Sequence, residues 1–347
     1  MNTIENKTAI KRVLITGGTG FVGSKFFDLL RNRGLEIVRF DLLPPSDNTK
    51  FVKGDVRDKA AIDAAIAGVD AVVHLAAAHH DFGISAKTFY DVNVQGMQNV
   101  CDSMQKHGVR NLCFYSTVAI YGSQEFPNEE TPPAPESEYG KTKLAAEAVC
   151  RQWCETDPKN QCLTIRPTVI FGTNNFANMY FLIQQIDSGK FLRVGEMTNV
   201  KSLAYVDNIV NTTLELWLDQ QNQRAGYEYF NYVDQPDLTS WDIAQAVYDG
   251  LGKKPSSISV PYMLARLLVI PFDIVIALTG KNLPVSSARI RKLAKSQTQF
   301  DASKIHAISK SNKAPIPKGI SEMATWFRDH GKTAPYPNRR PSEDVAE

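Results

Sequence analysis

Short apolar runs alternate with longer amphipathic stretches over the first half of the chain. Runs of apolar residues, several of them closed by Gly, Asp or Ser, predict strands at 12–16, 36–40, 51–55, 70–75, 111–116 and 161–166. Between these runs, apolar residues recur three and four positions apart, which predicts helices over 21–33, 59–67, 88–107 and 137–156. Glycines follow the first three helices, where a residue without a Cβ can end a helix.

Strands that alternate with helices of this length predict an α/β protein. The expected fold is a Rossmann-type, doubly wound parallel sheet with helices on both faces. After residue 166 the alternation loosens. We therefore predict a dinucleotide-binding domain over 1–166, a smaller and mostly helical substrate-binding lobe over 167–331, and a disordered tail over 332–347. Some segments of the lobe are expected to return to the first domain.

The first predicted strand ends in a glycine-rich run. Gly17, Gly20 and Gly23 stand between that strand and the following helix, which is the context of a dinucleotide pyrophosphate site. We expect Gly17 to allow a tight turn, Gly20 to let the backbone approach the phosphates, and Gly23 to let the helix pack closely on the strand. The helix N-terminus would add its dipole.

Polar residues follow other predicted strands, at the edge of the sheet where ligands bind. A carboxylate at Asp41 would bind a ribose 2′-hydroxyl and repel a 2′-phosphate, which favours NAD over NADP, with Arg39 expected to point to the other face. Asp55 could accept from the adenine amino group, or it could instead begin the next helix as its N-cap. His74 has apolar neighbours and is assigned to the strand rather than to catalysis.

Tyr139 and Lys143 are the candidates for proton transfer. A tyrosine hydroxyl is a weak base at neutral pH because its ordinary pKa is near 10. Lys143 lies four residues later, on the same helix face, and its charge is expected to favour the phenolate. Thr117, or its neighbour Ser116, could hold the substrate oxygen and relay its proton. Together with the glycine-rich run, these residues predict hydride transfer on an alcohol or a ketone.

Composition narrows the classes of function. The net charge of +2 gives no reason to expect a nucleic-acid partner, and the 43% of apolar residues allow a large core. The five cysteines contain no CxxC pair, so we expect reduced thiols and no metal site. Residues 1–12 are polar and show no secretory signal, which predicts a cytoplasmic protein.

Residues 261–279 are strongly apolar and almost long enough to span a bilayer. Arg266, Asp273 and the internal Pro271 argue against a transmembrane helix. The favoured interpretation is a pair of buried helices. The alternative is an apolar surface that contacts a membrane or admits a lipid-linked substrate.

Several motifs, in the same order along the chain, resemble those of the extended short-chain dehydrogenases/reductases of the NAD-dependent epimerase/dehydratase family. They are TGGTGFVG (16–23), GDVRD (54–58), HLAA (74–77), DVNVQG (91–96), YSTVAIYG (115–122), YGKTK (139–143), RPTVIFG (166–172) and AYVDNIV (204–210). Within the family, the chain is most similar to N-acetylhexosamine 4-epimerases of surface-polysaccharide synthesis, whose sugars are carried on UDP or on undecaprenyl diphosphate.

The resemblance implies NAD as cofactor and a set of site residues. Thr117, Tyr139 and Lys143 would be catalytic, with Tyr139 as acid/base and Lys143 on the nicotinamide ribose. The cofactor would lie against Gly17, Gly20, Phe21, Val22, Gly23, Asp41, Asp55, Val56, Leu75, Ala76, Ala77, Asn93, Ser116, Tyr139, Lys143 and Pro167. The substrate would lie against Ala78, His79, Thr117, Val118, Asn174 and Arg193.

The implied reaction is transient oxidation of the sugar at C4, followed by reduction on the other face. Cations for the diphosphate could come from Lys190, Arg193 or Lys201. A homodimer through the helices over 88–107 and 137–156 is a further implication of the resemblance.

Other members of the family supply the alternatives. A 4-keto sugar reductase or a hydroxysteroid-type dehydrogenase would use the same Thr, Tyr and Lys. A dehydratase is disfavoured because Val118 and Ala119, rather than acidic residues, follow Thr117. A non-catalytic dinucleotide-binding protein is disfavoured because the chain keeps both Tyr139 and Lys143.

Overall fold

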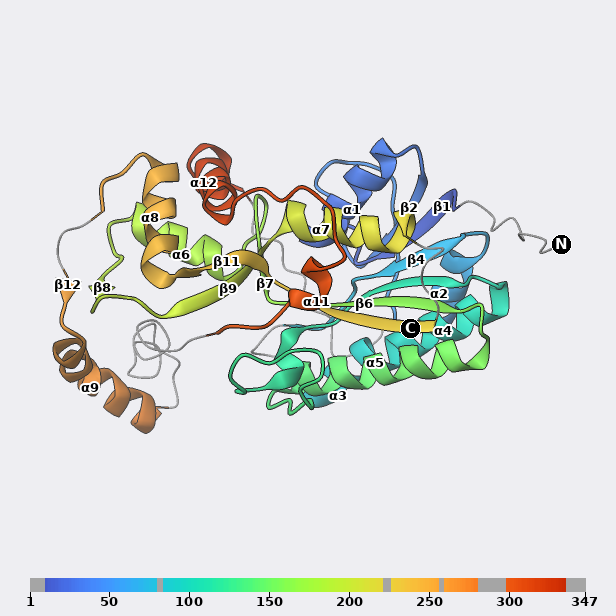
Figure 1. Ribbon diagram of the computed structural model, residues 1–347, viewed down its shortest axis with the longest axis horizontal. Helices are drawn as coiled ribbons and strands as arrows, with labels where there is room; N and C mark the ends of the chain where they lie inside the picture. The colour runs from blue at the N-terminus through green and yellow to red at the C-terminus, as the bar shows by residue number, and fades with distance from the viewer. Residues whose placement is uncertain (1–9, 80–83, 221–225, 256–258, 280–297, 335–347) are drawn as a thin grey trace.

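The computed structural model describes residues 10–79, 84–220, 226–255, 259–279 and 298–334. Its centre is a seven-stranded sheet in the order β10-β6-β5-β4-β1-β2-β3, with every neighbouring pair parallel (Figure 1). The strands are β1 (Arg12–Thr16), β2 (Glu36–Asp41), β3 (Val52–Lys53), β4 (Ala71–His74), β5 (Asn111–Tyr115), β6 (Gln161–Pro167) and β10 (Gly226–Tyr232). The predicted α/β fold class is confirmed.

Helices cover both faces of this sheet, as Figure 1 shows. One face carries α1 (Phe21–Asn32) and α7 (Val206–Leu214), and the other carries α2 (Lys59–Ile66), α4 (Gly96–His107) and α5 (Glu138–Thr156). The alternation of side chains along β1 explains the two layers. Val13 and Ile15 are buried in the cluster on the α1 side, and Leu14 between them is buried on the α4 side.

Two predicted elements differ in extent. The predicted helix over 88–107 begins earlier, at α3 (Ala86–Tyr90), because the Ser85 side chain accepts a hydrogen bond from the Thr88 N–H and so caps it. A π-helical turn (Asp91–Gln95) then joins α3 to α4. The predicted strand over 51–55 is only the two residues of β3, since β3 lies at the edge of the sheet and pairs with β2 alone.

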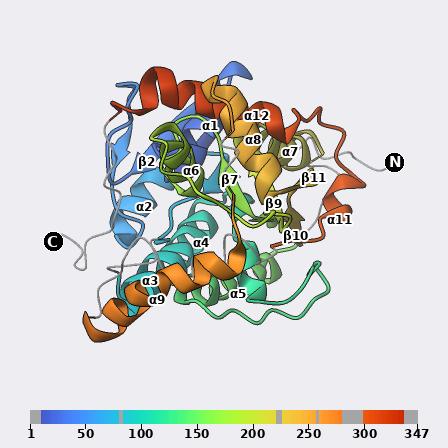
Figure 2. The same cartoon turned by 90° about the vertical axis from the view of Figure 1, so that its left-hand side faces the viewer.

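The second lobe combines helices with two small sheets, and Figure 2 views it from its own end of the molecule. A three-stranded sheet has the order β11-β9-β7, and a two-stranded sheet joins β12 to β8. The strands are β7 (Val169–Phe171), β8 (Arg193–Val194), β9 (Val200–Tyr205), β11 (Asp234–Thr239) and β12 (Ser259–Val260). The helices are α6 (Asn178–Asp187), α8 (Ser240–Leu251), α9 (Tyr262–Thr279), α11 (Ser303–His306) and α12 (Ile316–Trp326). The domain boundary at residue 166 stays a prediction, and most of the tail over 332–347 lies outside the described residues.

The apolar segment over 261–279 does not form two buried helices, so that interpretation is wrong. It forms the single helix α9, with Pro271 inside it. Several of its large apolar side chains are exposed, including Met263 at 64% and Leu267 at 61%. Across the part of the chain that the structure describes, no helix combines the length and the hydropathy needed to cross a membrane.

Candidate functional site

The glycine-rich turn between β1 and α1 packs against the end of β4. Gly17 has a φ of 66°, and a Cβ there would lie 2.8 Å from the Ala76 nitrogen. A Cβ on Gly23 would collide with the Gly17 carbonyl oxygen, so the helix can approach the turn only with glycine at this position. Gly20 is the N-cap of α1, which has neither a side-chain cap nor an acidic residue in its first turn. The helix N-terminus is therefore suited to an anion.

The Asp41 carboxylate is fixed beside this turn. It accepts hydrogen bonds from the Thr19 N–H at 3.0 Å and from the Leu42 N–H at 2.8 Å. Arg39 contacts the same turn, because its Nε donates to the Gly18 oxygen at 2.8 Å and its Nη2 donates to Ser24 Oγ at 3.0 Å. The expectation that Arg39 points to the other face is wrong, since residues two apart on a strand share a face. Its guanidinium is buried and already bonded, which leaves Asp41 as the charged group at the end of β2.

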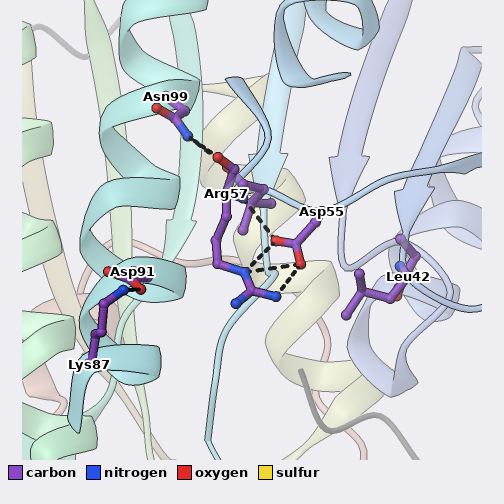
Figure 3. Close-up of polar contacts among 8 residues, drawn as sticks. Leu42, Asp55, Arg57, Lys87, Asp91 and Asn99 are labelled. Carbon is purple, nitrogen blue, oxygen red and sulfur yellow. Dashed lines mark hydrogen bonds and ion pairs between the residues drawn. The ribbon is translucent and has the colours of Figure 1, made fainter. Parts of the chain in front are cut away.

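Asp55 does not begin the next helix. The N-cap of α2 is Asp58, which accepts from the Ala60 and Ala61 N–H groups. Asp55 instead forms a two-pronged ion pair with Arg57, in which Nη2 lies 2.7 Å from Oδ2 (Figure 3). The pair fixes the orientation of the Asp55 carboxylate, whose remaining lone pairs could still accept from an adenine amino group.

Asn99 of α4 holds the backbone next to this pair. Its side-chain Nδ2 donates to the Val56 oxygen at 3.0 Å and to the Arg57 oxygen at 3.1 Å (Figure 3). In the same view, Lys87 and Asp91 form an ion pair one helical turn apart. The sequence analysis missed Arg57 and Asn99, although Arg57 stands within the GDVRD motif.

The chain that leaves β4 is held from two sides. His74 lies in β4, as predicted, and its Nδ1 is 2.8 Å from Thr16 Oγ1. Burial lowers the pKa of His74 to about 3, so the ring is neutral. Asn93 accepts from the Ala78 N–H at 2.8 Å and donates to the Ala78 oxygen at 3.1 Å. Its Nδ2 also donates to Thr142 Oγ1 at 3.0 Å, so Asn93 links this segment to α5.

The expected substrate residues near this edge differ in exposure. Ala78 is buried, while His79 is exposed, with its Nδ1 3.3 Å from the Ala77 oxygen. Val118 is buried as the first residue of the short 3₁₀ helix η2 (Val118–Tyr121). Residues 80–83, which follow His79, are not among the described residues.

Tyr139 and Thr117 meet at the carboxyl end of β5. Ser137 caps α5 by accepting from the Gly140 N–H, which sets Tyr139 in the first turn of the helix. The Thr117 hydroxyl lies close enough to the Tyr139 hydroxyl to lower its pKa, and it accepts a hydrogen bond from the Ala119 N–H at 3.1 Å. Ser116 Oγ, in contrast, is buried and has no partner among the described residues. Of the two hydroxyls, Thr117 is therefore the one that acts on the tyrosine.

Lys143 lies one turn further along α5 and is almost completely buried. Its Nζ is 4.3 Å from the centre of the Phe114 ring. Burial lowers the pKa of Lys143 to about 7, although the negative charge of Glu147 opposes this effect. Burial also raises the pKa of Tyr139 to about 12, and the nearby Thr117 hydroxyl offsets this only in part.

Without a ligand, the protein therefore does not favour the Tyr139 phenolate. The expectation that Lys143 lowers the Tyr139 pKa is wrong for the protein alone. The same loss of water that penalises the phenolate also penalises the ammonium. At neutral pH Lys143 is only partly protonated, so it cannot supply a full charge to Tyr139.

A buried ion pair lies behind Lys143, and the sequence analysis missed it. Glu147 is one turn beyond Lys143, and its two oxygens accept from Arg166 Nε at 2.9 Å and Nη2 at 2.6 Å. Arg166 Nη1 donates to the Tyr121 hydroxyl at 2.8 Å, and Tyr121 donates to Asn231 Oδ1 at 2.8 Å. The four-residue steps from Tyr139 to Lys143 to Glu147 were the available signal.

The remaining expected site residues lie beyond β6. Pro167 is buried at the end of β6, and Asn174 is exposed with a φ of 66°. Arg193 on β8 places its guanidinium 4.0 Å from the Trp241 ring centre, and its buried Nε has no partner among the described residues. Lys190 is exposed, and Lys201 lies in β9 opposite Leu238. The expected site residues thus lie in two places, some at the carboxyl edge of the large sheet and others in the second lobe.

The model of the NAD dependent epimerase/dehydratase family matches residues 13–231. The chain belongs to this family. The match spans the glycine-rich turn, Asp41, Asp55 and the Thr117, Tyr139 and Lys143 group.

Known relatives agree with this assignment. The N-acetyl-alpha-D-glucosaminyl-diphospho-ditrans,octacis-undecaprenol 4-epimerase of Escherichia coli O157:H7 is 44% identical over 326 residues, which is 92% of this chain and 96% of that protein. The UDP-N-acetylglucosamine 4-epimerase structure from Bacillus cereus has a TM-score of 0.70 at 20% identity, covering 92% of this chain and 97% of that chain. The Thermus thermophilus UDP-glucose 4-epimerase, solved with NAD, has a TM-score of 0.70 at 22% identity, covering 92% and 99%. At these identities the two structures show the shared fold.

The residues present fit the cofactor that gives the family its name. The N-terminus of α1 offers N–H groups to a diphosphate, and Asp41 offers a carboxylate to ribose hydroxyls. Lys143 is a buried amine with no hydrogen bond to another described side chain, which suits the hydroxyls of a second ribose.

Proposed function

We propose that the protein is an NAD-dependent 4-epimerase of an N-acetylhexosamine linked through diphosphate to its carrier, acting in glycan synthesis. The observation that carries the proposal is the 44% identity to the Escherichia coli enzyme over 92% of this chain. Thr117 and Tyr139 at the end of β5, with Lys143 one helical turn away, supply the groups that such a reaction needs.

The residues would act on the C4 hydroxyl of the sugar. Tyr139, as phenolate, accepts the hydroxyl proton while Thr117 holds the same oxygen or relays the proton. The C4–H and O–H bonds break and a 4-keto sugar forms. Bound NAD supplies the acceptor for the C4 hydride and the donor for its return. When the keto sugar has rotated in the site to present its other face, Tyr139 gives its proton back to the C4 oxygen.

Other residues would bind and orient. Gly17, Gly20 and Gly23 let the turn and the N-terminus of α1 hold the cofactor diphosphate, and Asp41 selects NAD over NADP. Asp55, Val56, Leu75, Ala76 and Ala77 line the same edge of the sheet as part of this proposal. Both Glu147 oxygens are bonded to Arg166, so Glu147 does not hold the Lys143 amine, which stays available to the cofactor ribose.

The sugar and its carrier would reach the second lobe. Arg193 is the preferred ligand for the substrate diphosphate, because its Nε has no partner among the described residues. Polyprenyl diphosphate is the preferred carrier and UDP the alternative, on the strength of the Escherichia coli relative's name. A cytoplasmic homodimer completes the proposal.

The test is epimerisation without added cofactor. Purified protein is incubated with UDP-N-acetylglucosamine and, separately, with a polyprenyl-diphosphate N-acetylglucosamine, and the anomeric and C4 signals are followed by NMR. The galacto isomer should appear with the polyprenyl substrate, because the cofactor is regenerated in each turnover and stays bound. If neither sugar changes, even after NAD is supplied, the epimerase proposal fails. Consumption of added NADH or NADPH would then indicate a net reductase.

A further inference from the structure

The helix α9 carries a stripe of exposed apolar side chains. The exposed residues are Met263, Leu264, Leu267, Leu268, Ile270 and Val275. Met263 and Leu267 stand four positions apart, as do Leu264 and Leu268, and Ile270 follows Leu267 by three, which places these side chains on one side of the helix. Ala265 and Val269 are almost fully buried and mark the opposite side, which packs on the protein. We call the exposed residues the α9 stripe.

The helix α9, which carries the α9 stripe, lies at one end of the molecule, in the second lobe, as Figures 1 and 2 show. The start of α9 is also connected to the strand next to Arg193, the candidate ligand for the substrate diphosphate. β12 leads directly into α9 and pairs with β8, so that Ser259 stands opposite Arg193. The Gly195 N–H donates to the Val260 oxygen at 2.9 Å, which closes this two-stranded sheet next to the start of α9. Leu192, just before Arg193, is 49% exposed and adds an apolar side chain next to β8.

The charge of the neighbouring sequence favours an anionic partner. Residues 280–297 follow α9 directly and contain no Asp or Glu, but they contain five basic residues: Lys281, Arg289, Arg291, Lys292 and Lys295. Basic residues that follow an apolar helix in the sequence are typical of segments that bind anionic bilayers. A helix that lies in the plane of the bilayer surface needs no membrane-spanning length, only an apolar face that can enter the headgroup region.

We propose that the α9 stripe docks this protein on the surface of an anionic lipid bilayer. The docking itself does not depend on the proposed function. Only the reason for docking, access to a sugar on a lipid carrier, rests on it. A polyprenyl carrier keeps its tail in the bilayer and its diphosphate at the headgroup level. Docking through α9 brings Arg193 to that level, so the sugar can enter the site without the carrier leaving the membrane.

The first experiment measures co-sedimentation of the purified full chain with vesicles. The vesicles contain phosphatidylcholine alone, or phosphatidylcholine with about one quarter phosphatidylglycerol. Wild-type protein should bind the anionic vesicles. The double variant Leu267→Glu, Leu268→Glu should bind at least roughly tenfold more weakly, since two apolar side chains can no longer enter the interface. Ile308→Glu, at an exposed apolar residue outside α9, is the matched control and should bind like wild type.

A second readout separates docking from catalysis. All three proteins are assayed on a water-soluble, short-chain prenyl-diphosphate N-acetylglucosamine, and their thermal unfolding is compared. The double variant should match wild type in both, yet be slower on the full-length carrier in vesicles. If wild type binds no vesicles, or if the double variant binds as well as wild type, the docking proposal is overturned. Turnover of the soluble substrate would leave the epimerase proposal standing in either case.

Two other results would also overturn the docking proposal. If wild type binds no vesicles and forms oligomers that the double variant does not, the α9 stripe is an interface between copies of the chain. If hydrogen exchange shows α9 fully protected in the vesicle-free protein and unchanged by vesicles, another part of the chain covers it.

Discussion

At the scale of single residues, the central feature is that burial acts on both members of the proton-transfer pair. Burial raises the pKa of Tyr139 to about 12 and lowers that of Lys143 to about 7. Each charged form is disfavoured in the same dry site, so Lys143 is only partly protonated at pH 7 and the protein by itself holds both groups neutral at higher pH, up to the pKa of Tyr139. Any charge that enters the site with a ligand will therefore act on groups that are not screened by water.

Tyr139→Phe should remove the acid/base and keep the fold. We expect kcat to fall by roughly 10³-fold or more, while the melting temperature and the amount of co-purified NAD stay close to wild type. Tyr121→Phe is the matched control, because it also removes one tyrosine hydroxyl. Tyr121 bonds to Arg166 and Asn231, so its loss should cost about 1 kcal/mol of unfolding free energy with little change in kcat. A Tyr139→Phe protein with near wild-type turnover would contradict the assignment.

His74 should make the protein less stable in acid. Its pKa is about 3 in the folded protein, against an ordinary value of 6.5, because the ring is buried. The unfolded chain takes up a proton at His74 below pH 6.5 and the folded chain does not, so stability falls as the pH drops from 6.5 towards 3. The contribution approaches about 1.4 kcal/mol per pH unit within this window. Urea unfolding at pH 7 and pH 5 should show a smaller difference for His74→Gln than for wild type, and equal differences would refute this origin.

At the scale of elements, local sequence patterns were sufficient to predict a strand or helix where neighbouring layers bury its side chains. β1 shows this, since Leu14 faces one helix layer while Val13 and Ile15 face the other. The sequence could not show how far α9 is covered, because an apolar run looks the same whether or not another element packs on it. It also could not show that Asp58 rather than Asp55 caps α2, since both are acidic residues near the helix start.

The positions of the candidate site residues could be predicted from the sequence, but their protonation could not. Gly17, Asp41 and Thr117 could be named because the carboxyl ends of parallel strands share one edge, and Tyr139 because Lys143 follows it by four residues on one helix face. The direction of the Tyr139 pKa could not be derived from its spacing to Lys143. That direction depends on how much water reaches both groups, which is a property of the packed structure.

Gly23→Ala should damage the junction of β1 and α1. The new Cβ would collide with the Gly17 oxygen, so α1 must move away from the turn that we propose holds the cofactor. We expect about 1–3 kcal/mol less unfolding free energy and at least tenfold weaker NAD retention. Gly108→Ala is the control, because Gly108 ends α4 with a φ of 70° and open space around it. It should cost about 1 kcal/mol and leave NAD retention unchanged, whereas equal NAD retention in both variants would contradict the packing argument.

At the scale of the whole molecule, the large sheet and the second lobe are connected by two crossings of the chain. The chain crosses from the large sheet into the second lobe after β6 and returns to the large sheet with β10, which pairs with β6 along seven positions. Lys25 of α1 forms an ion pair with Asp207 of α7, so the helix that begins at the glycine-rich turn also contacts the returning chain. In the proposed function, these connections would keep a substrate bound by the second lobe at a fixed position relative to Tyr139.

Arg193→Ala tests this division of labour. If Arg193 binds the substrate diphosphate from the second lobe, its loss should raise KM by roughly tenfold while kcat changes little, because the reacting groups lie at the sheet edge. Lys190→Ala removes an exposed cation three residues away and should leave both constants near wild type. Arg193 also stacks on Trp241, so Arg193→Gln serves to separate charge from packing: it keeps a polar, planar group there but no charge. A rise in KM for both Arg193 variants with unchanged melting temperatures would place the diphosphate at β8, whereas a fall in kcat at constant KM would place Arg193 in the chemical step instead.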